Sequence, residues 1–419
     1  MRLERRFAIA IAALGLTGAN ASATEPTALT RDEARAVVAE MLADAAARSS
    51  LLAAPATTAG WDKGFVLASP DGAYKLNVGG YTQIRWIAGV QDSGDNRNTW
   101  QSGFDLTRTR LDFRGHVVDP RLTYWLKLAF GSNGNTQLLD GFARYDLGDG
   151  FAVQVGQFKI PLWTEWVLSE TRLQFVERSI VEARFSPTYS QGVQLAYAPA
   201  DGPFRAYATF TDGQRALNTP LTVPDQPGEP NNTDWAATGR AELKLTGQWS
   251  DYADTTSFRD QAEPLVVLSA SLHGQDGGRD ALSTQDRSIT RWSADVLAKL
   301  GGWSLFAAAV GNREEGPTTF EQWGALVQSG YFVTDQLEFV ARFEWGDLGA
   351  ESPDRANLLA LTGGFNYFFA KHAAKITVDA GVALNEIAPA WRAAARGWRP
   401  DAQESGDQVV VRTQLQLMF

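Results

Sequence analysis

The sequence contains no cysteine, so a disulfide framework and a thiolate metal site are both excluded for this 419-residue chain. Beyond its N-terminal region it has no run of about 20 consecutive apolar residues, the length that a membrane-spanning helix needs. It has three histidines, and none lies in a recognisable nucleophile–base or metal-ligand grouping. These absences predict that the chain is not an enzyme and uses no cofactor or metal. They leave open a soluble β-protein or a closed transmembrane β-barrel.

The first 23 residues have the three parts of a secretory signal peptide. Arg2, Arg5 and Arg6 form a basic start, Phe7–Ala19 is a short apolar stretch, and Ala21-Ser22-Ala23 is a small-residue cleavage site. The apolar stretch is too short to cross a bilayer as a helix. We therefore expect residues 1–23 to be removed and the remaining chain to be exported.

Residues 24–60 are expected to form a separate periplasmic segment. Thr30 and Glu33 form a capping box before an amphipathic pattern that predicts a helix over roughly Arg31–Leu52. The following Ala53–Gly60 has the composition of a linker. The apolar stripe of this helix needs a partner. Other copies in a short coiled coil and the periplasmic mouth of the next domain are equally good candidates.

From Trp61 onward the chain consists of amphipathic β-strand patterns. In the last of them, Gln408–Phe419, every second residue from Val409 to Phe419 can face an apolar medium. A chain that stops on an aromatic residue at the end of such a strand looks like the closing strand of an outer-membrane barrel. Sixteen such segments lie between Tyr74 and Phe419. Residues 61–419 are therefore predicted to form an all-β fold, a 16-stranded antiparallel transmembrane β-barrel.

The connections between these segments alternate in length, as they do in outer-membrane barrels with both termini in the periplasm. Very short turns such as Gly148-Asp149-Gly150 alternate with longer loops, of which Pro161–Ser190 is the longest. Two connections fit this pattern badly. Asp251–Glu263 is long for a periplasmic turn, and Gly131–Gln137 is short for an external loop.

Period-2 alternation also predicts which side chains face the lumen. In the segment Phe104–Val117, for example, Arg108, Arg110 and Arg114 fall on the face opposite the apolar residues. Sixteen basic residues are predicted to face inward: Lys75, Arg85, Arg108, Arg110, Arg114, Arg121, Lys127, Arg144, Lys159, Arg240, Lys244, Arg291, Lys299, Arg342, Lys375 and Arg412. The eight inward acids are Asp112, Asp140, Asp146, Glu242, Asp295, Glu338, Glu344 and Asp379. The charges predict a water-filled lumen that prefers anions.

Three motifs resemble the phosphate-selective porin O and P family. They are Arg108-Thr109-Arg110-Leu111-Asp112-Phe113, the segment Gly156–Pro161 continuing through Leu173–Ser179, and Ser190–Leu195. The resemblance covers roughly Tyr74 to Phe419. It implies a sixteen-stranded homotrimeric porin of the bacterial outer membrane in which the third external loop, here Pro161–Ser190, folds inward and forms the constriction.

The resemblance also implies the residues of the constriction. It places an arginine of the anion site at Arg108, the loop arginine at Arg178, a serine at Ser169 and an acidic partner at or beside Asp140. The lysine position of the family is Trp166 here, and a second serine position is Glu170, which weakens a dedicated phosphate site. The predicted constriction and anion-binding residues are Arg108, Arg110, Arg114, Asp140, Lys159, Trp166, Ser169, Glu170, Arg172 and Arg178.

The expected partners are small anionic or polar solutes such as phosphate, together with outer-membrane lipid and lipopolysaccharide. With a net charge of −10, no nucleic acid is expected. Two alternatives remain. One is a porin for neutral solutes such as sugars, with Trp163, Trp166 and Phe175 at the constriction. The other is a soluble exported carbohydrate-binding protein.

Overall fold

The structure is a computed structural model that describes residues 31–52, 58–62, 64–91, 99–131, 134–218, 233–277, 287–316, 318–349, 357–385, 387–399 and 408–419. The chain divides into two compact units, Met1–Ala56 and Thr57–Phe419, and each is described by itself. The predicted signal peptide lies outside the described residues.

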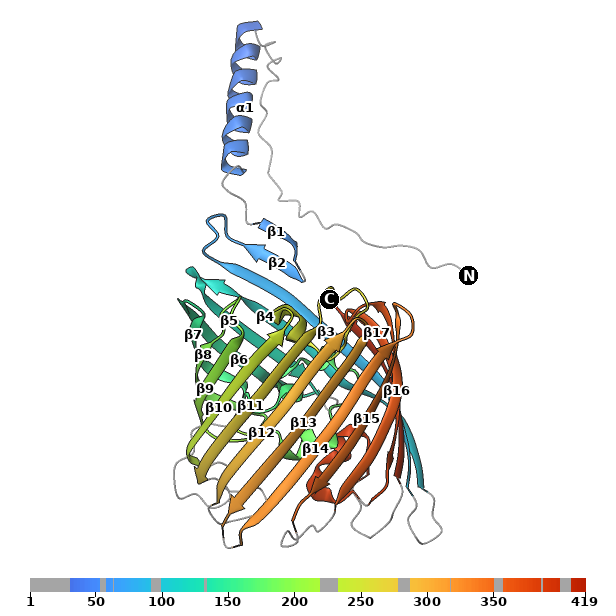
Figure 1. Ribbon diagram of the computed structural model, residues 1–419. Coiled ribbons are helices and arrows are strands. Elements are labelled where there is room, and N and C mark those ends of the chain that lie inside the picture. The colour runs from blue at the N-terminus through green and yellow to red at the C-terminus, as the bar shows by residue number, and fades with distance from the viewer. Residues whose placement is uncertain are drawn as a thin grey trace, which may run out of the picture. The chain divides into compact units, whose positions relative to one another are not determined.

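Sixteen long strands build most of the second unit. They are β3 (Lys75–Gln91), β4 (Thr99–Val117), β5 (Asp119–Phe130), β6 (Thr136–Gly148), β7 (Phe151–Lys159), β8 (Tyr189–Tyr197), β9 (Phe204–Thr211), β10 (Thr233–Thr246), β11 (Leu265–Gly277), β12 (Ser288–Leu300), β13 (Trp303–Glu315), β14 (Phe320–Phe332), β15 (Leu337–Asp347), β16 (Leu358–Ala370), β17 (Ala374–Ala383) and β18 (Gln408–Met418). Each strand pairs antiparallel with the next, and β18 pairs with β3. This closure confirms the predicted sixteen-stranded antiparallel barrel (Figure 1).

The last strand closes the sheet along its whole length. Its pairing with β3 runs from Gln408 opposite Gln91 to Met418 opposite Tyr81. Phe419 and Gly80 then exchange two backbone hydrogen bonds of 2.8 and 3.0 Å. The carboxyl end of the barrel therefore has no free strand edge, which is how a membrane barrel satisfies its backbone polar groups.

Two short strands that the sequence reading did not predict extend the sheet beside β3. They are β1 (Thr58–Trp61) and β2 (Phe65–Ala68), which pair with each other, and β2 also pairs with the start of β3. β1 therefore begins within the stretch that the sequence analysis treats as a linker.

The tight turns lie at one end of the barrel (Figure 1). The turn between β6 and β7 needs three consecutive residues with positive φ, Gly148 at 92°, Asp149 at 53° and Gly150 at 84°. Glycine and aspartate adopt this conformation more easily than other residues, so the Gly-Asp-Gly sequence suits a tight hairpin. Both β3, at its first residue, and the chain terminus Phe419 lie at this turn end.

The strands present an apolar face outward and a charged face inward, as the alternation predicted. In β15, Phe339, Phe343 and Trp345 are 51%, 45% and 41% exposed, whereas the alternating Glu338, Arg342 and Glu344 are buried. An exposed row of aromatic side chains costs free energy in water but not against lipid. The barrel is therefore built for a membrane, and the soluble carbohydrate-binding alternative is wrong.

One part of the barrel wall is shorter than the rest. β5 pairs only with the Thr109–Val117 half of β4, because β5 and β6 meet in a short connection. The other half of β4, from Thr99 to Arg108, pairs only with β3 among the described strands. The connection Gly131–Gln137, which fits badly as an external loop, therefore leaves half of β4 with an open edge.

The described part of the first unit is a single helix, α1 (Arg31–Leu52), whose bounds are those predicted. Val37, Val38, Met41 and Leu42 lie exposed on it, so the apolar stripe has no partner among the described residues of this unit. Among the described helices, none combines the length and apolar composition needed to span a membrane.

Candidate permeation pathway

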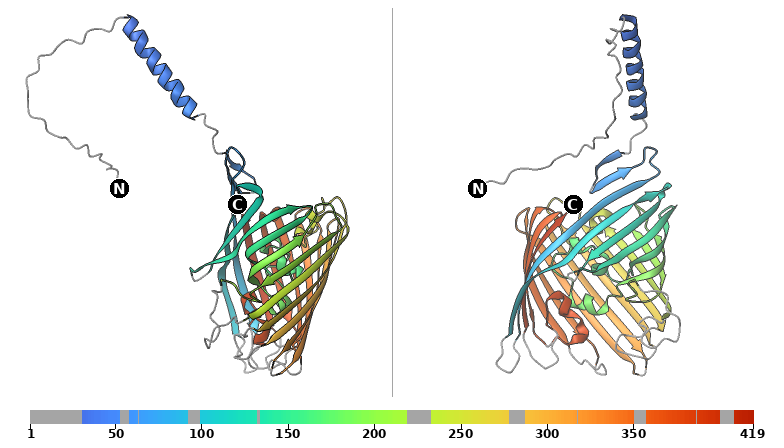
Figure 2. Two further views of the ribbon diagram at one scale, coloured as in Figure 1. Left: turned by 90° about the vertical axis from the view of Figure 1, so that its left-hand side faces the viewer. Right: turned by 180° about the vertical axis from the view of Figure 1, so that it is seen from behind.

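The connection between β7 and β8 lies inside the barrel (Figure 2). It contains α2 (Thr164–Val167), a 3-10 turn at Glu170–Arg172, and α3 (Ile180–Phe185). Within residues 161–188, Val167 is the only exposed residue. The prediction that this loop folds into the lumen is therefore confirmed, and we refer to residues 161–188 as the inner loop.

Strands β11 to β18 hold the inner loop through its backbone carbonyl groups. Ser271 Oγ and Ser293 Oγ each donate to the Leu162 carbonyl at 2.6 Å. Arg291 donates to the Phe185 carbonyl at 2.7 Å, and Asn366 donates to the Gln174 carbonyl at 2.8 Å. Buried carbonyl groups need such donors because water cannot reach them. The inner loop is thus fixed against one side of the barrel.

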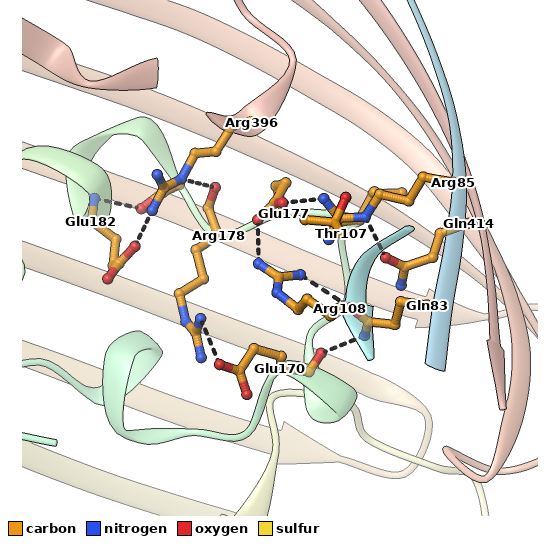
Figure 3. A network of polar contacts seen from close by, with 12 residues as sticks. Gln83, Arg85, Thr107, Arg108, Glu170, Glu177, Arg178, Glu182, Arg396 and Gln414 are labelled. Carbon is orange, nitrogen blue, oxygen red and sulfur yellow. Dashed lines mark hydrogen bonds and ion pairs between the residues drawn. The ribbon is translucent and has the colours of Figure 1, made fainter. Parts of the chain in front are cut away.

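Carboxylates of the inner loop neutralise cations of the wall. Glu177 accepts from Arg108 Nη2 at 2.7 Å and also pairs with Arg85 (Figure 3). Glu165 lies 3.6 Å from Arg342 Nη1. These inward charges are therefore buried in ion pairs and do not face open water. Strand periodicity cannot detect carboxylates that a loop brings in.

Arg178 is held by the inner loop itself. It donates to the Glu165 carbonyl at 2.9 Å and the Leu168 carbonyl at 2.8 Å, and it lies 3.7 Å from Glu170. Arg108 is similarly bound, to Glu177 and Gln83. The side chains of Arg178 and Arg108 are 4% and 11% exposed, so both are shielded from solvent. Their contact with a permeating anion stays a prediction.

Trp166 lies beside Arg178, and its ring is in contact with two cations. Its ring centroid is 5.1 Å from Arg178 Cζ and 4.7 Å from Lys159 Nζ. The same Lys159 ammonium donates to the Trp166 carbonyl at 2.8 Å. The indole therefore separates two positive charges by cation–π contacts. A lysine at this position would place a third cation between them.

The other loop residues of the predicted site have structural contacts. Ser169 caps the 3-10 turn and accepts from Thr171 N at 3.4 Å. Glu170 accepts from Tyr81 Oη at 3.1 Å. Arg172 is partly exposed and lies 3.8 Å from Asp254.

A cavity of about 260 Å³ lies between the inner loop and the wall of β5 to β10. It contains three residues of the predicted site, Asp140, Lys159 and Ser169. Its full lining is Trp125, Lys127, Asp140, Phe142, Gln154, Phe158, Lys159, Pro161, Val167, Ser169, Gln194, Tyr207, Arg240 and Glu242. The predicted Arg108, Arg110, Arg114, Trp166, Glu170, Arg172 and Arg178 are not among these lining residues.

Four aromatic residues of this cavity, Trp125, Phe142, Phe158 and Tyr207, were absent from the predicted site. The signal was present for Trp125, because alternation in Arg121–Phe130 puts it in phase with the inward Thr123 and Lys127. Trp163, Trp166 and Phe175, which the neutral-solute alternative placed at the constriction, are instead buried and do not line this cavity.

The cations that line the cavity on strands are largely neutralised. Lys127 Nζ lies 3.5 Å from Asp140 and 3.8 Å from Asp112. Arg240 donates to Glu242 at 2.8 Å and lies 3.6 Å from Asp295. The cavity itself therefore carries little net charge.

Five further basic side chains on or next to the strands that line the cavity also face the lumen. They are Arg110, Arg114, Arg144, Arg205 and Lys244. Within the described residues, none of them has a carboxylate within ion-pair distance. Arg114 instead lies over Trp125 at 5.2 Å, and Arg205 lies over Trp249 at 4.0 Å. Arg205 was missed in the sequence, although it is in phase with the inward Tyr207. We call these five side chains the unpaired basic set.

Two of the sixteen predicted inward cations lie at the rim of the barrel instead. Lys75 pairs with Asp62 at 3.2 Å, and Arg121 pairs with Asp119 at 2.8 Å. Asp62 lies in the connection between β1 and β2, and Asp119 is the first residue of β5, at the turn from β4. The predicted excess of inward positive charge was therefore overestimated, because turns and the inner loop supply acids that the strand count omits.

Two further connections reach into the barrel. Between β10 and β11, Tyr252 Oη lies 3.0 Å from Thr164 of the inner loop. Between β17 and β18, Arg396 donates to the Arg178 carbonyl at 3.1 Å and pairs with Glu182 (Figure 3). The inner loop is thus contacted from both ends of the barrel.

The family model described as "Phosphate-selective porin O and P" matches residues 78–419. A comparison with curated proteins gave no match. Among solved structures, the chain is similar to an anion-selective porin from Comamonas acidovorans, with 12% identity and a TM-score of 0.60 over 83% of this chain and 100% of that one. It is also similar to the outer membrane channel DcaP of Acinetobacter baumannii, with 14% identity and a TM-score of 0.52 over 84% and 99% of the two chains.

A third similar structure is the trimer form of OmpT, an outer membrane protein of Vibrio cholerae. It has 10% identity and a TM-score of 0.51 over 82% of this chain and 99% of that one. Likenesses at such low identity concern the barrel fold, whereas the family match covers most of the chain.

Proposed function

Because the chain belongs to the phosphate-selective porin O and P family, we propose that it forms a passive diffusion channel that prefers small anions. It is a β-barrel porin of the bacterial outer membrane, as its family and its fold show. Its outward apolar band would contact outer-membrane lipid and lipopolysaccharide.

The observation that carries the anion preference is the unpaired basic set. These side chains lie on the cavity-lining strands β6, β9 and β10 and on β4, which neighbours the lining strand β5. Charges of one sign inside a low-dielectric wall raise the local concentration of oppositely charged ions. Because the buried arginines of the described residues, apart from Arg291, are paired with carboxylates, the unpaired basic set supplies most of the remaining positive potential.

A reversal-potential measurement in planar bilayers under a KCl gradient tests this function. We expect the wild type to be anion-selective and the triple variant Arg114→Gln/Arg144→Gln/Arg205→Gln to lose most of that selectivity. The matched control is Arg259→Gln/Arg313→Gln/Lys371→Gln, in which each cation is exposed and paired with a surface carboxylate. A cation-selective wild type would overturn the proposal.

We propose general anion permeation rather than a dedicated phosphate site. Phosphate needs several converging donors, and the cavity does offer Lys127, Lys159 and Ser169. However, the carboxylates of Asp140 and Glu242 line the same cavity and would repel a divalent anion. Arg108, Arg110, Arg114, Arg172 and Arg178, with Trp166 and Glu170, remain proposed constriction residues.

We further propose the domain arrangement that the sequence predicts. Residues 1–23 would be the signal peptide, residues 24–60 a periplasmic segment, and the barrel would follow with both its ends in the periplasm. The position of Lys75 and Phe419 at the turn end of the barrel supports this orientation.

The family expectation of a homotrimer is supported by the open edge of β4. Trp100, Phe104 and Leu106 are 59%, 83% and 54% exposed along this half-strand, which pairs only with β3 among the described strands. An apolar strand edge without a neighbour is a site for association. A second copy of the chain would cover it.

A further inference from the structure

We propose that the cavity between the inner loop and the wall is a transit site for aromatic carboxylates, that is, monoanions with one planar ring. This inference rests on the proposed anion channel and names a substrate class for it. The inference is based on the combination of aromatic rings and cations around one opening. Inorganic anions do not need aromatic contacts in order to permeate.

The apolar part of the site comes from both sides of the cavity. Trp125 and Phe142 lie on neighbouring strands of the wall, with ring centroids 5.9 Å apart in an edge-on arrangement. Val167 lines the cavity from the inner loop and is 41% exposed, although most of that loop is buried. Apolar side chains that face a pore favour solutes with an apolar body over fully hydrated ions.

The ring of Trp125 is held in a fixed orientation. Its Nε1 donates to Asp112 at 2.8 Å, while Lys127 Nζ lies 4.6 Å and Arg114 Cζ 5.2 Å from the ring. Two cations therefore lie next to the aromatic surface. A solute ring in contact with Trp125 or Phe142 would place its carboxylate within reach of these cations.

The remaining charges favour a monoanion. Lys127, Lys159 and Arg240 line the cavity together with Asp140 and Glu242. A single carboxylate can be oriented toward the cations, whereas a small divalent anion would stay close to both acids. The volume also fits, since a cavity of about 150 Å³ holds benzene and this one measures about 260 Å³.

The test compares benzoate with gluconate, a hydrophilic monoanion without a ring, in bi-ionic reversal-potential measurements against chloride. We expect wild-type permeability to benzoate to exceed that to gluconate by about fivefold, the size of an aromatic contact. Phe142→Ser/Val167→Ser should reduce this ratio toward unity. Because neither substitution changes a charge, the selectivity for chloride over potassium should persist.

The matched control is Phe343→Ser/Val327→Ser, which changes the same residue types at a facing pair on the outer surface. It should keep the benzoate preference. Block of the wild-type chloride current by benzoate, but not by gluconate, and its weakening in the single variant Val167→Ser provide a second measurement if the double variant does not fold.

Two outcomes separate the inference from the function on which it rests. An anion-selective wild type with equal permeability to benzoate and gluconate would overturn the inference alone. A cation-selective wild type in a KCl gradient would overturn the proposed function.

Discussion

Glu177 joins the inner loop to both β3 and β4 through ion pairs. Its two carboxylate oxygens pair with Arg85 and Arg108, and all three side chains are nearly inaccessible to solvent. A buried carboxylate between two guanidinium groups is a demanding arrangement, because removing one member leaves the others charged and unpaired. Glu177 therefore stabilises the position of the loop more than it shapes the opening.

We predict that Glu177→Gln destabilises the refolded barrel by about 3 kcal/mol or more, the usual cost of breaking a buried ion pair from one side. Urea unfolding followed by tryptophan fluorescence measures the change. The control is Glu321→Gln, whose carboxylate pairs with exposed Arg313 at 3.4 Å. It should change the free energy of unfolding by less than about 1 kcal/mol. Equal effects of the two substitutions would contradict a special role for Glu177.

Asp140, unlike Glu177, lines the cavity, and its carboxylate pairs with a cation that could otherwise bind a permeating anion. Its carboxylate lies 3.5 Å from Lys127 Nζ. Asp140→Asn should strengthen the block of chloride current by phosphate, since it removes a repelling charge and leaves Lys127 with Asp112 as its one remaining carboxylate among the described residues. We expect an increase in phosphate affinity of about tenfold, corresponding to about 1.4 kcal/mol, while wild-type block stays weak.

Titration of single-channel chloride current with phosphate measures this effect. Asp146→Asn, at an exposed position on the same strand, is the control. Tight block of the wild type by micromolar phosphate would show that the cavity already provides a phosphate site.

At the scale of elements, the connection between β10 and β11 is more than a turn. Tyr252 Oη lies 2.8 Å from Ser269 Oγ and accepts from Arg240 at 3.1 Å, and Asp254 accepts from Lys299 at 2.7 Å. Thr255, Thr256 and Ser257 are also buried. Burial makes the pKa of Asp254 rise, but Lys299 and His372 outweigh it and hold that pKa well below its ordinary value. The segment therefore stays charged and anchored at the turn end of the barrel.

We predict that replacing Ser250–Ala262 with Asn-Gly raises the single-channel conductance, because the segment occupies space at this end of the barrel and contacts the inner loop. The shortened connection keeps Gly247–Trp249 and Glu263-Pro264 and so has seven residues, more than the two that neighbouring antiparallel strands need. Tyr252→Phe removes only the hydroxyl contacts and should leave the conductance near the wild-type value. An unchanged conductance in the shortened variant would mean that ions do not pass this segment.

At the scale of the whole molecule, the sequence predicted the wall better than the contents of the lumen. Alternation gives the faces of β15 directly, because each side chain must point to one side of a strand. The length of Asp251–Glu263 marks it as an unusual turn, but the sequence does not predict the direction in which this segment folds. The partners of Arg85 and Arg342 come from a loop, and no strand period relates Glu177 or Glu165 to them. Alternation identifies Trp125 as an inward residue. Its proposed contact with a solute also depends on Val167, which the inner loop places on the other side of the cavity.

The half of β4 without a second described neighbouring strand is a candidate site of assembly between copies of the chain. Thr99–Arg108 lacks a second neighbour among the described strands, and Trp100 and Phe104 are exposed along it. If a second copy covers this edge in a trimer, Trp100→Ser/Phe104→Ser should shift the detergent-solubilised protein to monomers, measured by light scattering after size-exclusion chromatography. Tyr331→Ser, at an exposed aromatic residue of β14, should keep the trimer. A double variant that stays trimeric would place the interface elsewhere on the barrel.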